Sequence, residues 1–416
     1  MRILFLSQWF TPEPDFKGLP FARELQRRGH EVVVLTGFPN YPGGKVYPGY
    51  RIRFWQWEKM DGIEVLRVPL YPSHDRSAIG RVLNYASFAV AATVLGLLKI
   101  RRVDVAYVYH PPATIGLPAL AFQWLRGVPC VYDVQDLWPD TLAATGMVRS
   151  RALLGLAGYW SNFIYRHVTH AVVLSPGFKA RLIERGVKPG NVSVIYNWSP
   201  DARRADAPTV LLETEQRLLA NRFNVVFAGN LGAAQGLDTV LAAAGLLQST
   251  QPAVQFVFVG DGVDAAHLKA DAARRALANV LFLPRRPAAA MGAMYATADA
   301  LLVHLRDDPL FEITIPSKTQ AYLAAGRPIL MAVRGDAAAL VTQAGAGLCC
   351  EPGNAAQLAA LVRQLLAMPE ADRIAMGAAG SRFYEEVLDL RRGVQAFENL
   401  FVHLRIVQEN AALKVL

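Results

Sequence analysis

The sequence is poor in cysteine and has no motif that combines cysteine with histidine. Its 416 residues include three cysteines, Cys130, Cys349 and Cys350, and none of them has a C-x-x-C partner. Disulfide-rich secreted domains and zinc sites need paired or regularly spaced cysteines, so both classes are excluded. We therefore expect a protein of a reducing compartment without a structural metal.

Charged residues are also scarce, at 19% of the chain against about 25% in an average soluble domain. Hydrophobic residues make up 53%, which excludes a disordered chain. The first residues include one arginine and a short apolar run without an A-x-A cleavage site, so we expect a first strand and not a signal peptide. The length suits two or three domains of roughly 100–200 residues each.

The excess of basic residues lies in one half of the chain. Lys and Arg total 43 against 34 acidic residues, a formal charge of +9. Residues 1–200 carry 23 basic and 13 acidic residues, or +10, while residues 201–416 carry 20 and 21. A basic half can face nucleic acid, an anionic bilayer or an acidic substrate. Stretches that interleave aromatics with basic residues all fall in strands or loops of the α/β pattern, which argues against nucleic acid.

Short buried strands alternate with helical patterns in the first 200 residues. A strand at Arg2–Leu6 leads through a glycine-containing loop to a helix at Phe21–Arg28 and a strand at Glu31–Thr36. Right-handed crossovers of this kind give a doubly wound parallel sheet. Further strands are predicted at 63–68, 103–109, 130–134, 171–174 and 192–196.

The same pattern restarts after a predicted linker near 198–205. Strands are predicted at 223–228, 255–259, 280–283, 300–303, 328–331 and 347–350, separated by alanine-rich helices. We predict an α/β protein with two Rossmann-like domains of doubly wound parallel sheets, residues 1–200 and 201–390. The chain from 353 onward has a helical pattern nearly throughout, and we expect a final helix at 391–416 to return to the first domain.

One long apolar stretch in the first half has two interpretations. Seventeen uncharged residues, 82–98, lie between Arg81 and Lys99. A helix that spans a bilayer needs about 20 predominantly apolar residues, so a buried helix covering a sheet is one interpretation. The other is a helix with one exposed face in a bilayer surface, helped by the flanking cations. The two can hold on different faces of the same helix.

Open α/β sheets bind ligands at the carboxyl ends of their strands, so the loops there are the candidate sites. In the second half these loops contain Gly229-Asn230-Leu231 with Gln235-Gly236, Gly260-Asp261-Gly262, Arg285-Arg286, and Pro316-Ser317-Lys318 at the start of a helix. Glycines, free backbone N–H groups and a cation at a helix N-terminus suit a diphosphate. Each motif alone also has a plain structural interpretation: a tight turn, solvated arginines, or a helix N-cap.

The first half has fewer signals at its strand ends. Gly18 follows the first strand, His110 the strand at 103–109, and Gln135-Asp136 the strand at 130–134. A single histidine beside two prolines is usually structural. The G-x-S-x-G elbow, the Walker loop and H-E-x-x-H are lacking, so the serine hydrolases, nucleoside triphosphatases and zinc proteases that use them are not indicated.

Taken in order, these residues resemble the retaining glycosyltransferases of family 4, whose GT-B architecture has two Rossmann-like domains facing each other across a cleft. The resemblance covers essentially the whole chain. Its general marks are Arg28-Gly29-His30, Val194-Ile195-Tyr196-Asn197, Gly229 with Gly236, Gly260-Asp261-Gly262 and Ala325-Gly326-Arg327-Pro328. Narrower marks are residues 36–42 (TGFPNYP), Asp136-Leu137-Trp138-Pro139, Asn230-Leu231-Gly232 with Gln235-Gly236-Leu237, and Pro316-Ser317-Lys318. These are similar to the branch of bacterial surface-polysaccharide transferases with WbuB-type N-acetyl-L-fucosamine transferases.

The resemblance implies transfer of a sugar from a UDP-sugar with retention of anomeric configuration, and without a metal. The acceptor would be a saccharide linked to polyprenyl diphosphate, in O-antigen or exopolysaccharide synthesis, at an anionic membrane surface on the cytoplasmic face of the inner membrane. Gly18 would lie on the acceptor side, in the first domain. The donor would lie against residues of the second domain: Gly229, Asn230, Leu231, Gln235, Gly260, Asp261, Gly262, Arg285, Arg286, Pro316 and Ser317. The catalytic candidates are Lys318, Gln135 and Asp136, and Lys318 would neutralise charge on the leaving phosphate.

The chain departs from the family pattern in three places. Asn230 and Gln235 stand where most members carry an Arg and a Lys that clamp the diphosphate. Ile313 and Ala321 stand at the positions of a Glu-x7-Glu pair, and Gln135 stands where a histidine often lies. A nucleotide-binding module without transfer activity is therefore the alternative, although the narrower marks favour an enzyme.

Overall fold

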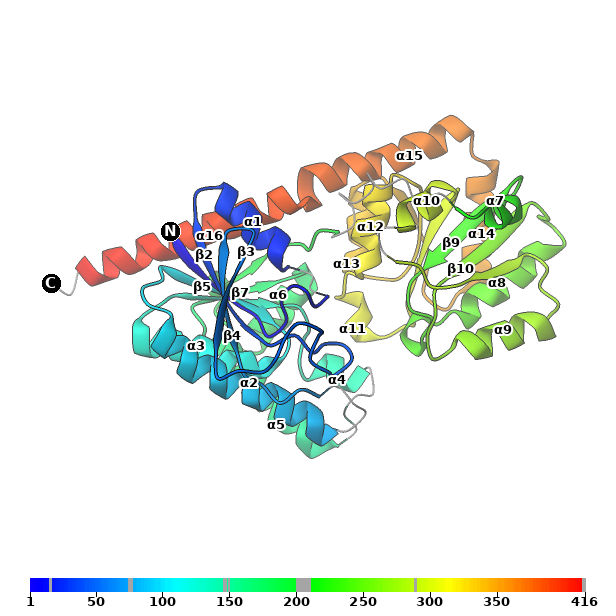
Figure 1. Ribbon diagram of the computed structural model, residues 1–416. Coiled ribbons are helices and arrows are strands. Elements are labelled where there is room, and N and C mark those ends of the chain that lie inside the picture. Colours follow the sequence, from blue (N-terminus) through cyan, green and yellow to red (C-terminus); the bar gives the residue numbers. More distant parts are fainter. Residues whose placement is uncertain are drawn as a thin grey trace. The chain divides into compact units, whose positions relative to one another are not determined.

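The computed structural model describes residues 1–14, 17–73, 78–144, 148, 150–199, 211–287 and 290–413 (Figure 1). The chain divides into two compact units, residues 1–196 with 393–416 (unit 1) and residues 197–392 (unit 2). The sequence predicts divisions after residues 200 and 390, which lie four and two residues from the divisions after residues 196 and 392 in the structure. Most of the predicted linker, 200–205, lies outside the described residues. Each unit is an α/β sheet flanked by helices, which confirms the predicted fold class.

Unit 1 contains an eight-stranded sheet in the order β3-β4-β2-β1-β5-β6-β7-β8. Its strands are β1 (Arg2–Leu6), β2 (Glu31–Gly37), β3 (Gln56–Met60), β4 (Ile63–Val68), β5 (Val105–His110), β6 (Cys130–Val134), β7 (His170–Val173) and β8 (Val192–Val194). All neighbours pair in parallel except β3, which runs antiparallel to β4 at the edge. The sequence did not predict β3, because its residues alternate between half-buried and exposed and lack an apolar run.

Helices cover both faces of this sheet (Figure 1). Unit 1 contains α1 (Leu19–Arg27), α2 (Ala78–Lys99), α3 (Gly116–Arg126), α4 (Asp140–Ala144), α5 (Arg151–His167), α6 (Pro176–Glu184) and most of α16 (Leu390–Leu413). Helices α1 and α16 lie on one face, and α2, α3 and α5 lie on the other.

The apolar stretch at 82–98 forms most of α2, which has a buried and an exposed face. Phe88 and Ala92 are fully buried against the sheet, while Val82 and Leu98 are more than half exposed. Residues 79–99 are long and apolar enough to cross a membrane by length and composition. The buried inner face agrees with the first of the two interpretations given above.

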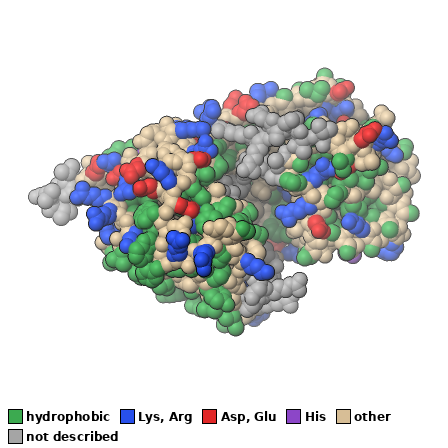
Figure 2. Space-filling model, in the orientation of Figure 1, with side chains coloured by type: hydrophobic (Ala, Val, Ile, Leu, Met, Phe, Trp, Pro, Cys, Tyr) green, Lys and Arg blue, Asp and Glu red, His purple; other side chains and the backbone are tan. Residues whose placement is uncertain are grey.

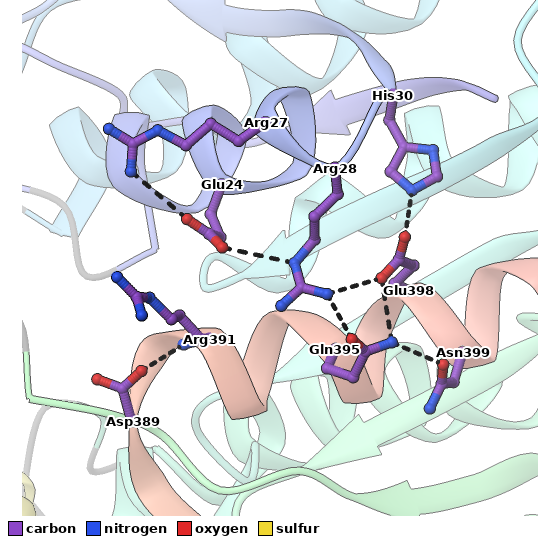
Figure 3. Close-up of polar contacts among 9 residues, drawn as sticks. All are labelled: Glu24, Arg27, Arg28, His30, Asp389, Arg391, Gln395, Glu398 and Asn399. Atoms are coloured by element: carbon purple, nitrogen blue, oxygen red, sulfur yellow. Dashed lines mark hydrogen bonds and ion pairs between the residues drawn. The ribbon is translucent and has the colours of Figure 1, made fainter. Parts of the chain in front are cut away.

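The C-terminal helix α16 packs on the sheet of unit 1, as expected. Phe397 is fully buried, with its ring 5.3 Å from each of the rings of Phe21 and Tyr107. At the edge of this contact, the Glu398 carboxylate accepts from Arg28 at 3.0 Å and lies 2.8 Å from His30 Nε2 (Figure 3). The Arg28-Gly29-His30 motif therefore fixes the end of the chain to the first domain.

Unit 2 contains a six-stranded parallel sheet in the order β11-β10-β9-β12-β13-β14. Its strands are β9 (Phe223–Ala228), β10 (Val254–Val259), β11 (Val280–Leu283), β12 (Ala300–His304), β13 (Ile329–Ala332) and β14 (Gly347–Cys349). Its helices are α7 (Glu213–Leu219), α8 (Asp238–Gln248), α9 (Ala265–Arg274), α10 (Met291–Ala296), α11 (Pro309–Glu312), α12 (Ser317–Ala325), α13 (Asp336–Gln343), α14 (Ala355–Ala367) and α15 (Glu370–Phe383). The four central strands are entirely buried, as expected for a parallel sheet covered on both faces, while the edge strands β11 and β14 are mostly half-buried.

Candidate active site

A pocket of about 460 Å³ lies at the carboxyl ends of the unit 2 strands. Six of the residues that line it were predicted from the sequence: Gly229, Asn230, Gly260, Asp261, Arg285 and Arg286. The lining also includes Met291 and Tyr295 of α10, which the sequence did not indicate because this short helix has no glycine or charge motif. The strand-end loops of β9, β10 and β11 thus meet at one site.

The glycine loops after β9 and β10 are joined to each other by backbone hydrogen bonds. Leu231 N donates to Asp261 O at 2.9 Å, and Asp264 N donates back to Leu231 O at 2.9 Å. Gly260 has a φ of +153°, and a Cβ on it would lie 1.9 Å from Gly229 O. Glycine is therefore required at 260 because the two backbones approach too closely for any side chain.

Lys318 projects from the N-terminal turn of α12 beside Gly229. Its Nζ is shielded from solvent, has no hydrogen-bond partner among the described residues, and lies 3.7 Å from the ring centroid of Phe227. A Cβ on Gly229 would be 3.5 Å from this Nζ. Burial lowers the pKa of Lys318 to about 7, because the charged form loses hydration without gaining a counter-ion. A bound anion would supply that counter-ion.

The start of α12 adds backbone donors to the same place. Pro316 is the N-cap residue and no side chain caps the helix, while Ser317 is exposed. The N-terminus of a helix carries unpaired N–H groups and a partial positive charge, and both attract phosphate. The combination of an uncapped helix and an uncompensated amine favours an anionic ligand over the simple N-cap interpretation.

His304, at the end of β12, lies under the loop after β9. Its Nδ1 is 2.6 Å from Gln235 O, and its Nε2 has no partner among the described residues. Burial lowers its pKa, and the nearby charge of Lys318 lowers it further. The sequence did not indicate His304, although this residue directly follows the strand predicted at 300–303, as the other candidate loops follow theirs. The Gln235 side chain accepts from Gly232 N at 3.2 Å, so it stabilises its own turn.

The two arginines after β11 have different environments. Arg285 is exposed, whereas Arg286 forms an ion pair with Glu215 of α7, and both of these side chains are largely buried. The charge of Arg286 is therefore balanced within the protein. Of the two guanidinium groups at this strand end, only that of Arg285 is solvated, and the buried Lys318 amine has no counter-ion in the part of the chain that the structure describes.

In unit 1 the Asp133 carboxylate contacts both the predicted residue Gln135 and Lys17, the neighbour of the predicted residue Gly18. The Asp133 carboxylate accepts from Lys17 Nζ at 2.6 Å, from Tyr107 OH at 2.6 Å and from Gln135 Nε2 at 2.7 Å. Lys17 and Asp133 are fully buried. Gly18 follows Lys17 and is the N-cap of α1. The sequence missed Asp133 because it lies inside an apolar strand.

Burial shifts the pKa of two other groups at this edge of unit 1 in the direction that favours the uncharged form. Burial raises the pKa of the half-buried Asp136. Burial lowers the pKa of His110 to about 3, and its ring packs against Tyr132 and Trp138. His110 is therefore a neutral packing residue. Among the described residues, no group of three or more His, Cys, Asp or Glu side chains is placed to hold a metal ion.

Two family models match successive parts of the chain. The model of a glycosyl transferase 4-like domain matches residues 19–198, and that of the glycosyl transferases of group 1 matches residues 213–382. The chain belongs to the family 4 glycosyltransferases. The two matches correspond to units 1 and 2, so the pocket of this glycosyltransferase lies in the part that matches group 1.

Relatives and solved structures agree with this assignment. The transferase is 29% identical to the Escherichia coli K12 protein WcaI, named for colanic acid biosynthesis, over 96% of this chain and 99% of that protein. Its fold matches trehalose-6-phosphate synthase from Burkholderia multivorans with a TM-score of 0.73 at 15% identity, covering 100% and 98% of the chains. It also matches Anabaena HepE, solved with UDP and glucose, with a TM-score of 0.66 at 18% identity over 96% and 99%. The chain is thus a glycosyltransferase of polysaccharide biosynthesis with the GT-B fold.

We expect Gly260→Ala to destabilise unit 2 of the transferase by about 2–4 kcal/mol, because the methyl group clashes with Gly229 O and the backbone is strained. It should also distort the pocket, since the two loops would separate. The matched control is Gly245→Ala in α8, where a Cβ meets only Leu277 at 3.6 Å. Urea unfolding would measure the loss, and a free energy of unfolding of Gly260→Ala equal to that of Gly245→Ala would contradict this account of the loops.

Proposed function

We propose that this glycosyltransferase transfers a sugar from a UDP-sugar to a saccharide linked to polyprenyl diphosphate, with retention of anomeric configuration. The observation that carries the proposal is the amine of Lys318, which is buried beside Gly229 and the uncapped start of α12 with no counter-ion among the described residues. A nucleoside diphosphate has the charge and length to occupy the adjacent pocket and reach this amine. HepE, which has the same fold, was solved with UDP and glucose, and this supports UDP.

The chemistry follows from the leaving group. The bond between the anomeric carbon and the β-phosphate oxygen breaks, and UDP leaves with the electron pair. Lys318 and the N–H groups at the start of α12 neutralise the charge that develops on that phosphate, so no metal is required. The acceptor hydroxyl forms the new bond to the anomeric carbon and gives its proton to the departing phosphate. Gln135 can orient a hydroxyl but cannot act as an acid or base near pH 7.

The proposed acceptor side is unit 1, near Gly18, Gln135 and Asp136. The Gln135 amide nitrogen donates to the Asp133 carboxylate, and this hydrogen bond fixes the direction of the Gln135 amide oxygen. The half-buried Asp136 carboxyl, with its raised pKa, adds a second polar group at the same strand end. The excess of +10 in residues 1–200 favours an acceptor that carries a diphosphate at an anionic membrane surface, on its cytoplasmic face.

A donor panel tests the proposed function. The purified full-length enzyme would be incubated with UDP-sugars, including UDP-N-acetyl-L-fucosamine, and with GDP-sugars, each with and without saccharide-linked polyprenyl diphosphate. We expect release of UDP with one UDP-sugar that increases with acceptor, no effect of EDTA, and a product with the anomeric configuration of the donor. Release of GDP alone would overturn the assignment of UDP, and a product of opposite configuration would overturn retention.

A further inference from the structure

The outer face of helices α2, α3 and α5 in unit 1 carries large apolar side chains exposed to solvent. We call it the apolar face. Its most prominent members are between 63% and 74% exposed: Ile79, Val82, Leu98, Leu125, Leu156 and Tyr159. Helix α3 packs against both α2 and α5, so the three helices form one surface. Figure 2 shows hydrophobic side chains gathered over this side of the unit, with basic ones among them.

The charge of these helices is of one sign. Their fifty residues (22, 11 and 17) include no Asp or Glu but contain Arg81, Lys99, Arg126, Arg151 and Arg166. Surface helices of soluble proteins usually carry both signs on their polar side. A surface that is apolar and purely basic matches a bilayer with anionic headgroups, in which apolar side chains enter the interface and cations contact phosphate.

An aromatic segment continues this pattern at the C-terminal end of α2. Phe54 is 69% exposed and Trp55 is 39% exposed, next to the exposed Arg51 and Arg53. The Nζ atom of Lys99 lies 3.7 Å from the ring centroid of Trp55, which ties the segment to α2. Tryptophan and basic residues together are typical of membrane–water interfaces.

Helix α2 is held to the sheet and lies flat on it. Asn84 accepts from Gln8 Nε2 at 2.6 Å and donates to Tyr71 O at 2.7 Å, and Phe88 on the same face is fully buried. A spanning orientation would break these hydrogen bonds and place an amide in hydrocarbon. The helix therefore has one side available to lipid and one side committed to unit 1.

We propose that the apolar face binds the surface of a bilayer that contains anionic lipid, with α2 lying in the plane of the interface. This proposal rests on the proposed function, because an enzyme that uses a lipid-linked acceptor must reach it at the surface of a bilayer. A second copy of the chain is a poorer occupant, because two copies of this face would oppose cations to cations without acidic partners.

Flotation of the full-length protein with vesicles tests the proposal. We expect binding to vesicles of phosphatidylcholine with phosphatidylglycerol at about 0.05 M salt, and at least about tenfold less with phosphatidylcholine alone or at about 0.5 M salt. Val82→Asp with Leu125→Asp should lower binding about tenfold or more, since each places an anion where lipid phosphate lies. Leu246→Asp with Ile374→Asp, at exposed apolar positions of unit 2, is the matched control and should bind as the wild type does.

Separate readouts distinguish the possible failures. Urea unfolding followed by tryptophan fluorescence should give the same midpoint for the wild type and both double variants, which shows that unit 1 is folded. UDP binding by calorimetry should also be equal in all three. Vesicle binding without UDP binding would refute the proposed function and leave the docking surface standing. The docking proposal is overturned if the wild type does not float with anionic vesicles, or if Val82→Asp with Leu125→Asp floats like the control. It is equally overturned if that variant converts a dimer to a monomer while vesicle binding is unaffected.

Discussion

Lys318→Ala should lower kcat for sugar transfer by about a hundred- to a thousandfold, which is the usual loss when one preorganised donor to a developing anion is removed. The expectation rests on the amine itself, which is buried beside Gly229 and has no hydrogen-bond partner among the described residues. The helix N-terminus remains in the variant, so some activity should persist. Steady-state kinetics with the donor found in the panel would measure the loss. The matched control is Lys269→Ala, an exposed lysine of the same unit, which should leave kcat unchanged.

Stability separates a catalytic role of Lys318 from a structural one. A buried amine without a counter-ion is unfavourable in the folded state, so Lys318→Met should leave the free energy of unfolding unchanged or raise it. A structural lysine would show the opposite result, with activity and stability lost together. If Lys318→Ala kept the kcat of the wild type, the assignment of the diphosphate site to the start of α12 would be wrong.

The pH dependence of UDP binding gives an independent test of the same group. The pKa of Lys318 is lowered to about 7 in the free protein, and a bound diphosphate favours the charged form and raises it. Below pH 7 the amine is already protonated, whereas above pH 7 it must take up a proton when UDP binds. UDP affinity should therefore fall as pH rises above 7. The calorimetric enthalpy there should depend on the ionisation enthalpy of the buffer, and Lys318→Met should lose both effects.

The candidate residues that the sequence indicates are those whose position is set by the local chain. Gly229, Gly260 and Lys318 follow or precede buried segments, so the strand-end rule places them at one edge of a parallel sheet without knowledge of side-chain contacts. The parallel sheets themselves follow from the apolar runs. The antiparallel edge strand β3 was not predicted, because it is only half-buried and has no apolar run.

The features that the sequence could not indicate are contacts between distant parts of the chain. Glu215 neutralises Arg286 from a helix 71 positions earlier, and no pattern near either residue indicates the pair. Lys17 and Asp133 are separated by 116 positions. The charge of the first domain could be counted from the sequence, but its arrangement could not. That three helices without acidic residues share one face became visible only when the fold placed α2, α3 and α5 side by side.

Lys17→Met should destabilise unit 1 by about 3–5 kcal/mol, the usual cost of breaking a buried ion pair from one side. The Lys17 Nζ and Asp133 Oδ2 atoms are 2.6 Å apart with both side chains fully buried, and the amine also lies 4.8 Å from the ring centroid of Phe397 in α16. Removing the amine leaves a buried carboxylate with the two neutral donors Tyr107 and Gln135. Six of the seven tryptophans lie in residues 1–196, so urea unfolding followed by tryptophan fluorescence reports mainly on unit 1.

A double variant and an exposed pair show whether burial causes the effect. Lys17→Met with Asp133→Asn removes both charges, so it should be destabilised by less than the sum of the two single variants. Arg23→Met breaks an ion pair of similar length with Asp61, 3.0 Å, in the same unit, but both side chains are about half exposed. It should cost less than about 1 kcal/mol, because solvent screens such pairs. If Lys17→Met and Arg23→Met lowered the free energy of unfolding equally, burial would not be the cause of the effect. The buried pair would then not stabilise the strand end from which Gln135 projects.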